Sequence, residues 1–379
     1  MHANPSRQPP DTVEGRLVLE GRVVPGRVRV ADGLIAHVEP DERAAGGPYV
    51  APGFVDVHVH GWGGHDAMGG PEALTGMARA LLRRGVTSFL PTAVTAPLEA
   101  LRAFAETVRR WSADPSGDGA APLGFDLEGP CISPARAGAQ NPAFIQVPAA
   151  VGWEAFEPLL EGLRVITIAP ELDGALDVIA RLSASGVAVA LGHSMATAAQ
   201  ARAGYAAGAR TTTHLFNAMT GVHQHEPGLA TIALGDDGVY VELIADGHHV
   251  DRSLWPLILR AKPAGRLILV SDAISLAGTG DGRTTLGGLE VEVRGDQCRL
   301  VSDGRLAGSV IALDTAVRNL VRAGVSVPAA VATATANPLD LLGVRDRGRL
   351  APGLRADLVL LDDDLRVRRV MRAGAWVEV

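Results

Sequence analysis

Cysteine is scarce in this chain: Cys131 and Cys298 are the only two among 379 residues. They lie far apart in the sequence, so we expect no disulfide framework. The N-terminal run MHANPSRQPPD is polar and proline-rich and contains no apolar stretch, which argues against a signal peptide or a membrane anchor. We therefore expect a soluble protein with no membrane partner and a cytoplasmic location.

The chain also lacks an excess of positive charge. It has 42 acidic and 35 basic residues, a formal net charge of −7, and the charges are scattered along the sequence. The sequence therefore contains no basic stripe that could bind nucleic acid, and we expect no nucleic-acid partner. Lysine is almost missing, with Lys262 the only one, so arginine supplies the positive charge and one arginine is weak evidence for an anion site.

With 379 residues and a hydrophobic content of 47%, the chain is long and apolar enough to form one large domain and a smaller companion domain. In its middle, apolar strand-like runs alternate with stretches of helical period, a pattern typical of parallel βα repeats. Helical stretches fit between most of the runs, for example Glu72–Arg84, Pro97–Trp111 and Ser253–Ala261. The eight strand-like runs are Phe54–His58, Thr87–Pro91, Leu123–Leu127, Val165–Ala169, Val187–Leu191, Thr211–His214, Tyr240–Ile244 and Leu267–Ser271.

Eight parallel βα units predict an α/β fold of the (β/α)8 TIM-type barrel kind, with its chemistry at the carboxyl ends of the strands. Both ends of the chain instead carry short β-rich segments broken by turn residues, with three C-terminal strands at Asp357–Leu361, Val367–Met371 and Ala375–Val379. We predict a small β-sandwich domain from residues 1–51 and 345–379, beside a barrel of residues 52–344. Residues 276–308 are predicted to insert a β-hairpin after the eighth strand.

The first chemical signal ends the first strand-like run, in PGFVDVHVHG. Alternate residues of a strand point the same way, so His58 and His60 can converge on one ion. Such a pair alone is more often coincidence than a metal site. Four more runs end in a ligand-type side chain, however: Glu128 in DLEGP, His193 in LGHS, His214 in TTHLFNAM and Asp272 in LVSDA.

Six such side chains at the ends of five predicted strands favour a metal site over a set of satisfied core residues. Imidazole and carboxylate ligands without thiolate suit Zn, Fe, Mn or Co, so we predict one or two divalent metal ions, with zinc as the first choice. Cys131 follows Glu128 in the loop GPCISP, and we interpret it as a buried spectator rather than a redox group or an extra ligand.

Taken together, PGFVDVHVHG, DLEGP, LGHS, THLFNAM, DGHHV, VSDA and a late AGS resemble the N-acetylglucosamine-6-phosphate deacetylase family of the amidohydrolase superfamily, over nearly the whole chain. The resemblance implies a homodimer that hydrolyses the acetamide of N-acetyl-D-glucosamine 6-phosphate to D-glucosamine 6-phosphate and acetate, in amino-sugar catabolism or cell-wall recycling. It also implies a metal-bearing barrel beside a β-sandwich, which agrees with the pattern of the runs.

The resemblance implies a role for each ligand-type residue. Glu128, His193 and His214 would hold the main catalytic ion, and His58 and His60 with Glu128 a second one. Many members of the superfamily bridge two ions with a carboxylated lysine from the fourth strand. Lys262 lies just before the eighth strand, so any bridge has to come from Glu128.

Asp272 resembles the acid/base of the family. In that role it would take a proton from the attacking water and return it to the leaving amine. A plain metal ligand or a helix N-cap are the other interpretations of this aspartate.

Two positions depart from the family's substrate-binding pattern. His225 replaces the arginine that meets the sugar phosphate, and Gln140 replaces a histidine in the loop after the third strand. His249 matches the remaining phosphate-side histidine, and Asn217 and Ala218 are expected to line the same pocket, although Asn217 could also cap a loop. The departures keep a second hypothesis open, a deacetylase of a different or unphosphorylated N-acetyl amino sugar. A catalytically silent relative is disfavoured because all six ligand-type residues are present.

Overall fold

The computed structural model describes residues 11–41, 46–113 and 118–378. Residues 1–10, which include nearly all of the run in which no signal peptide is expected, lie outside the described residues. No helix in the described part of the chain is long and apolar enough to cross a membrane.

The central sheet is parallel, and its strands follow one another in chain order. Nearly all of their residues are buried, as expected for parallel strands covered on both faces. The ring closes between the first and last strands, where Asp272 N donates to His58 O and His60 N donates to Ala273 O, both at 2.9 Å. This confirms the predicted barrel. Its strands are β5 (Phe54–Val59), β8 (Val86–Ala93), β10 (Phe125–Glu128), β11 (Leu163–Ile168), β12 (Ala188–Leu191), β13 (Thr211–Thr212), β14 (Tyr240–Leu243) and β15 (Leu267–Leu269), with β9 (Ala121–Pro122) paired to β8.

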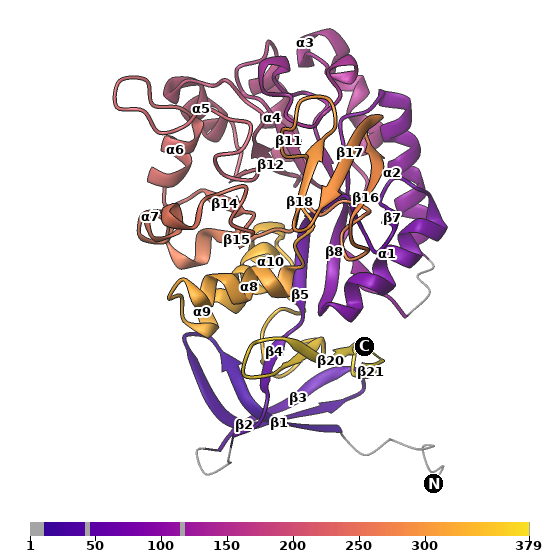
Figure 1. Cartoon of the computed structure of the whole chain (residues 1–379), viewed down its shortest axis with the longest axis vertical. Helices are drawn as coiled ribbons and strands as arrows, with labels where there is room; N and C mark the ends of the chain where they lie inside the picture. The colour runs from indigo at the N-terminus through magenta and orange to yellow at the C-terminus, as the bar shows by residue number, and fades with distance from the viewer. Residues whose placement is uncertain (1–10, 42–45, 114–117, 379) are drawn as a thin grey trace.

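Helices surround this barrel (Figure 1). The longer ones are amphipathic. In α1 the buried positions Leu74, Met77, Ala78 and Leu81 recur every three or four residues, which places one apolar stripe against the strands. The helices are α1 (Pro71–Arg83), α2 (Leu98–Ala113), α3 (Pro148–Val151), α4 (Ala175–Ala184), α5 (Ala198–Ala206), α6 (Leu229–Gly235), α7 (Trp255–Ala261), α8 (Leu313–Arg322), α9 (Val327–Thr333) and α10 (Ala336–Leu342).

Both ends of the chain share a second, seven-stranded sheet at one end of the barrel (Figure 1). At its centre β4 pairs in parallel with β1 and antiparallel with β19, which joins the two termini. This sheet fits the small domain expected from the two ends, whose exact boundaries stay predictions. In spatial order its strands are β21 (Ala375–Val377), β20 (Val367–Arg372), β19 (Leu358–Leu361), β4 (Tyr49–Pro52), β1 (Asp11–Leu19), β2 (Arg22–Ala31) and β3 (Leu34–Pro40).

The segment after β15 forms a three-stranded antiparallel sheet of β16 (Gly282–Leu286), β17 (Leu289–Arg294) and β18 (Gln297–Leu300). The sequence predicts a two-stranded hairpin here, and the structure adds the third strand. Cys298 is buried on β18 with Val291 and Val293 of β17 in a small core of its own, which explains why the third strand packs rather than forming a loop.

Candidate metal centre and substrate cleft

All six predicted ligands lie at the carboxyl ends of barrel strands, and each is at most 6% exposed. Three of them stand just beyond their strands with positive φ: His193 at 46°, His214 at 27° and Asp272 at 49°. Left-handed backbone costs a residue other than glycine roughly 1–2 kcal/mol. Strain of this kind is typical of functional sites, where the surrounding structure holds a side chain in one direction.

One group of three ligand-type atoms forms around the first carboxylate oxygen of Glu128. His214 Nε2 lies 2.8 Å and His193 Nε2 2.9 Å from Glu128 Oε1, and the two imidazole nitrogens are 3.1 Å apart. All three residues are buried and could hold one metal ion.

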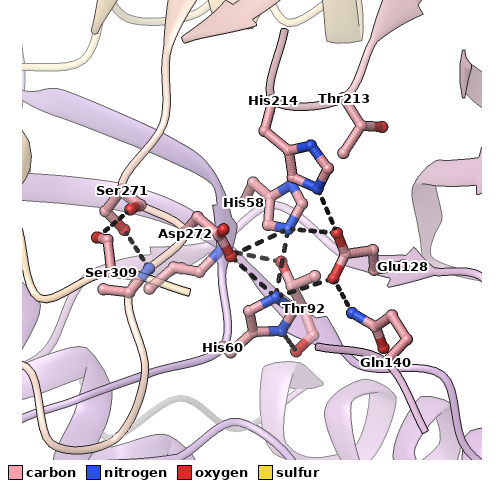
Figure 2. Close-up of polar contacts among 12 residues, drawn as sticks. His58, His60, Thr92, Glu128, Gln140, Thr213, His214, Ser271, Asp272 and Ser309 are labelled. Atoms are coloured by element: carbon pink, nitrogen blue, oxygen red, sulfur yellow. Dashed lines mark hydrogen bonds and ion pairs between the residues drawn. The ribbon is translucent and has the colours of Figure 1, made fainter. Parts of the chain in front are cut away.

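A second group lies on the other side of the same carboxylate. His58, His60 and Asp272 bring their atoms within 4.8 Å of one another, with His60 Nε2 at 3.2 Å from Asp272 Oδ1. His60 Nε2 is also 3.2 Å from Glu128 Oε2, and His58 Nε2 is 3.7 Å from Glu128 Oε1, so the carboxylate lies between His214 on one side and His58 and His60 on the other (Figure 2). The carboxylate is therefore placed to bridge two ions.

In three of the four histidines the far ring nitrogen indicates which atom faces the centre; His214 Nδ1 is buried and has no hydrogen-bond partner among the described residues. His193 Nδ1 donates to Arg136 O at 2.7 Å and His60 Nδ1 to Thr92 O at 3.1 Å, because a carbonyl can only accept. His58 Nδ1 faces Glu242 Oε2 at 3.3 Å. With the proton on Nδ1, the rings of His193, His60 and His58 present the Nε2 lone pair to the centre, as metal-bound histidines commonly do.

These groups match the requirements of a divalent cation. Tetrahedral coordination at about 2.0–2.1 Å separates neighbouring ligand atoms by about 3.3 Å, close to the distances within both groups. Lone pairs that point at one another at these distances repel unless a proton or a cation lies between them. The residues present therefore fit one or two ions.

The electrostatics of the centre favour positive charge. Burial opposes a charge on His60, yet its hydrogen bonds with Asp272 and Glu128 raise its pKa to about 10. Burial would likewise raise the pKa of Glu128, but His193 and His58 hold it well below its usual range. Asp272 behaves similarly, with its pKa lowered by His60 and His58 against the effect of burial. A cavity that attracts protons this strongly also suits a metal cation.

Two carboxylates beneath the centre escaped the sequence analysis. Glu242 on β14 is 1% exposed and faces His58. Both oxygens of Asp126 on β10 are buried and have no hydrogen-bond partner in the described part of the chain, and burial raises the pKa of Asp126 to about 7. Asp126 stands two residues before Glu128 and so points to the same side of its strand. The two-residue spacing from Glu128 could have identified Asp126 from the sequence. Glu242 lies inside an apolar run, and nothing in that run indicates which of its side chains point toward the centre.

A cleft of about 270 Å³ opens over the centre. Four of the five residues expected to contact substrate line it, namely Gln140, Asn217, Ala218 and His249, together with five of the six predicted ligands. His58 lies deeper and is absent from the lining. His225 does not line the cleft of its own chain either: its side chain is exposed on the loop beyond β13, with its backbone N 3.4 Å from His223 Nδ1.

Gln140 takes a different place from the one expected of a pure substrate contact. Its Nε2 donates to Glu128 Oε2, and its Oε1 accepts from Thr95 N at 2.7 Å (Figure 2). The amide therefore orients the carboxylate of Glu128 from the side of the cleft. Cys131 is fully buried, and burial raises the pKa of its thiol to about 12, which keeps the sulfur protonated.

The chain is similar to known proteins over most of its length. A model described as the amidohydrolase family matches residues 49–377. An N-acetylgalactosamine-6-phosphate deacetylase from Escherichia coli O157:H7 is 40% identical over 367 residues, 94% of this chain and 96% of the relative. An N-acetylglucosamine-6-phosphate deacetylase from Bos taurus is 38% identical over 358 residues, 90% of this chain and 86% of the relative.

A solved structure resembles the whole fold. It is a mutant of the N-acetyl-D-glucosamine-6-phosphate deacetylase from Mycobacterium smegmatis, in complex with N-acetyl-D-glucosamine-6-phosphate. The two structures superpose with a TM-score of 0.91 at 34% identity, over 98% of this chain and 100% of the other. Both the barrel and the sheet from the termini therefore recur in a protein that binds a phosphorylated amino sugar.

Proposed function

This chain belongs to the amidohydrolase family, and from that premise we propose that it hydrolyses the acetamide of N-acetyl-D-glucosamine 6-phosphate to D-glucosamine 6-phosphate and acetate. The resemblance seen in its motifs is confirmed by relatives named N-acetylglucosamine-6-phosphate deacetylase that match nearly the whole chain. The observation that carries the proposal is Glu128, whose carboxylate lies between two groups of ligand-type residues at the floor of one cleft.

We assign different roles to the residues of the centre. We assign Glu128, His193 and His214 to one ion and His58, His60 and Glu128 to a second, with Asp272, the third member of the second group, beside that ion. A bound divalent cation would polarise the amide carbonyl and lower the pKa of a water molecule. Zinc is our first choice of metal, because the imidazole and carboxylate set suits tetrahedral coordination, and Fe, Mn or Co suit it too.

Asp272 is assigned the proton transfer. Since its pKa is lowered by His60 and His58, its carboxylate is ionised near neutral pH and can accept a proton. It would take that proton from the attacking water and deliver it to the nitrogen that leaves. Asp272 N donates to His58 O at 2.9 Å and its carbonyl accepts from Ser309 N at 2.7 Å, so the backbone fixes where the carboxylate acts.

His249 is assigned to the phosphate of the substrate. It lines the cleft, and its Nδ1 pairs with Asp246 Oδ2 at 2.7 Å. Burial opposes its charge, but Asp246 outweighs that effect and raises the pKa of His249. A charged imidazole held in this way can donate its other N–H to an anion. Asn217 and Ala218 are assigned to the sugar.

We also propose a cytoplasmic homodimer. A sugar phosphate is charged and is therefore retained inside the cell, which supports the location. The resemblance implies that a neighbouring subunit reaches the phosphate end of the cleft, and the exposed position of His225 agrees with a contact to another subunit.

The test is an assay of acetate release over matched sugars: N-acetylglucosamine 6-phosphate, N-acetylgalactosamine 6-phosphate and both free sugars. The proposal expects the highest kcat/KM with N-acetylglucosamine 6-phosphate. The galactosamine epimer belongs in the panel because one relative is named for it. A higher kcat/KM for that epimer or for a free sugar would replace the proposed substrate.

A further inference from the structure

The phosphate end of the cleft needs a cation beyond His249, and His225 does not line the cleft of its own chain. Two arginines do line it, Arg136 and Arg305. Arg136 belongs to the loop after β10. Its carbonyl accepts from His193 Nδ1, and its Nε donates to Met195 Sδ at 2.9 Å. Arg305 follows β18, in the inserted sheet whose purpose the sequence does not reveal.

The backbone of Arg305 is fixed relative to the catalytic centre. Its carbonyl accepts from Leu300 N at 2.8 Å, which ties it to the end of β18. Four residues later, Ser309 N donates to Asp272 O at 2.7 Å, and a Cβ added at Gly308 would lie 3.0 Å from the same oxygen. The inserted sheet thus returns directly onto the proposed acid/base and carries Arg305 at the rim of the cleft.

The side chain of Arg305, by contrast, is held by an exposed ion pair, in which its Nε donates to Asp303 Oδ2 at 2.8 Å. Its Nη2 lies 2.7 Å from Asp303 Oδ2, with side chains 59% and 41% exposed. Exposed pairs of this kind contribute little, because water screens them and two side chains must be ordered. A phosphate has more charge and more acceptor oxygens than one carboxylate and can receive the planar fork of guanidinium in two parallel hydrogen bonds.

We propose that Arg305 binds the phosphate of the substrate together with His249, and that the inserted sheet β16–β18 thereby selects phosphorylated over free amino sugars. The inference rests on the proposed function, since it names how that substrate is held. It gives this chain a guanidinium at the phosphate although position 225 is a histidine.

The experiment compares KM and kcat for N-acetylglucosamine 6-phosphate and free N-acetylglucosamine in variants of the full-length holoenzyme. Arg305→Ala is expected to raise KM for the phosphate ester about tenfold to hundredfold, the usual effect of one lost charged hydrogen bond, with little change in kcat or in use of the free sugar. Arg305→Lys should recover part of the loss, because a lysine keeps the charge without the fork.

Arg283→Ala is the matched control. Arg283 lies on β16 of the same sheet, pairs with Glu292 at 3.0 Å in an exposed position and lies outside the cleft lining. This variant should leave both KM values unchanged. Asp303→Asn removes the carboxylate that competes for Arg305 and should leave KM for the ester the same or lower it.

The outcomes separate the two proposals. If the wild type prefers the ester and Arg305→Ala leaves KM unchanged, the inference is overturned while the proposed function stands. If KM for the ester rises with Arg136→Ala or His225→Ala instead, that residue rather than Arg305 binds the phosphate. If the wild type uses the free sugar as well as the ester, no phosphate selection exists, and the proposed substrate and the inference both fall.

Discussion

Replacing Asp272 by Asn removes a proton acceptor while leaving the shape of the centre nearly intact. The two backbone hydrogen bonds that fix residue 272, to His58 O and from Ser309 N, do not involve the side chain and should persist. An amide can still place an oxygen 3.2 Å from His60 Nε2, where Asp272 Oδ1 lies now. Fold and side-chain position should therefore change little.

The loss should fall on turnover. General acid/base catalysis by a positioned side chain contributes about 10²–10⁴-fold, which corresponds to about 2.7–5.5 kcal/mol in the barrier. Asp272→Asn should lower kcat for acetate release by a factor in that range, because an amide takes up no proton at neutral pH. KM should change much less, since the proposed role of the side chain is to move protons rather than to hold the sugar.

Three measurements on one preparation test this reasoning: kcat by acetate release, metal content by mass spectrometry and the melting temperature. The metal assigned to Glu128, His193 and His214 should remain, because none of these residues is altered. A variant that keeps more than about a tenth of wild-type kcat would exclude Asp272 as the acid/base. A low kcat accompanied by loss of all metal would instead make Asp272 a ligand.

Three further changes probe the support around the centre. Glu242→Gln removes the charge that faces His58 Nδ1 and should weaken metal binding about tenfold to hundredfold in a chelator titration, whereas unchanged affinity would make Glu242 only a packing residue. Replacing both His58 and His60 by Ala should remove one metal per chain and leave the other, so an unaltered metal count would assign this pair a structural role. Asp246 raises the pKa of His249, so in the folded enzyme its imidazole keeps its charge to a higher pH than an ordinary histidine and loses it as pH rises through that raised value; KM for the phosphate ester should rise over the same range. Asp246→Asn should move this rise to lower pH, and an unmoved profile would contradict the role of the pair.

The barrel and the candidate ligands could be predicted because both follow from periodicity. Each apolar run of β5 to β15 corresponds to one strand, and the ligand-type residues stand where those runs end. The run Thr211–His214 is shorter in the structure, with β13 ending at Thr212, because His214 turns into a left-handed conformation. Such a turn depends on tertiary contacts and has no signal in hydrophobicity.

What could not be predicted depends on contacts between segments far apart in the sequence. Gln140 meets Glu128 only because the loop after β10 folds back over its own strand. Arg305 reaches the cleft only because the third strand β18 turns the insertion back toward Asp272. His225 sits at the position expected to meet the phosphate, yet its loop carries it outside the cleft of its own chain.

The most direct test of the central claim is metal-dependent deacetylation by the wild-type chain. Prolonged chelation followed by removal of the chelator should abolish acetate release from N-acetylglucosamine 6-phosphate, and stoichiometric Zn, Mn, Co or Fe(II) should restore it. Glu128→Gln, which removes the charge shared by both groups, should bind less metal and should not recover under the same treatment. Full acetate release by wild-type protein that is verified as metal-free would contradict the account.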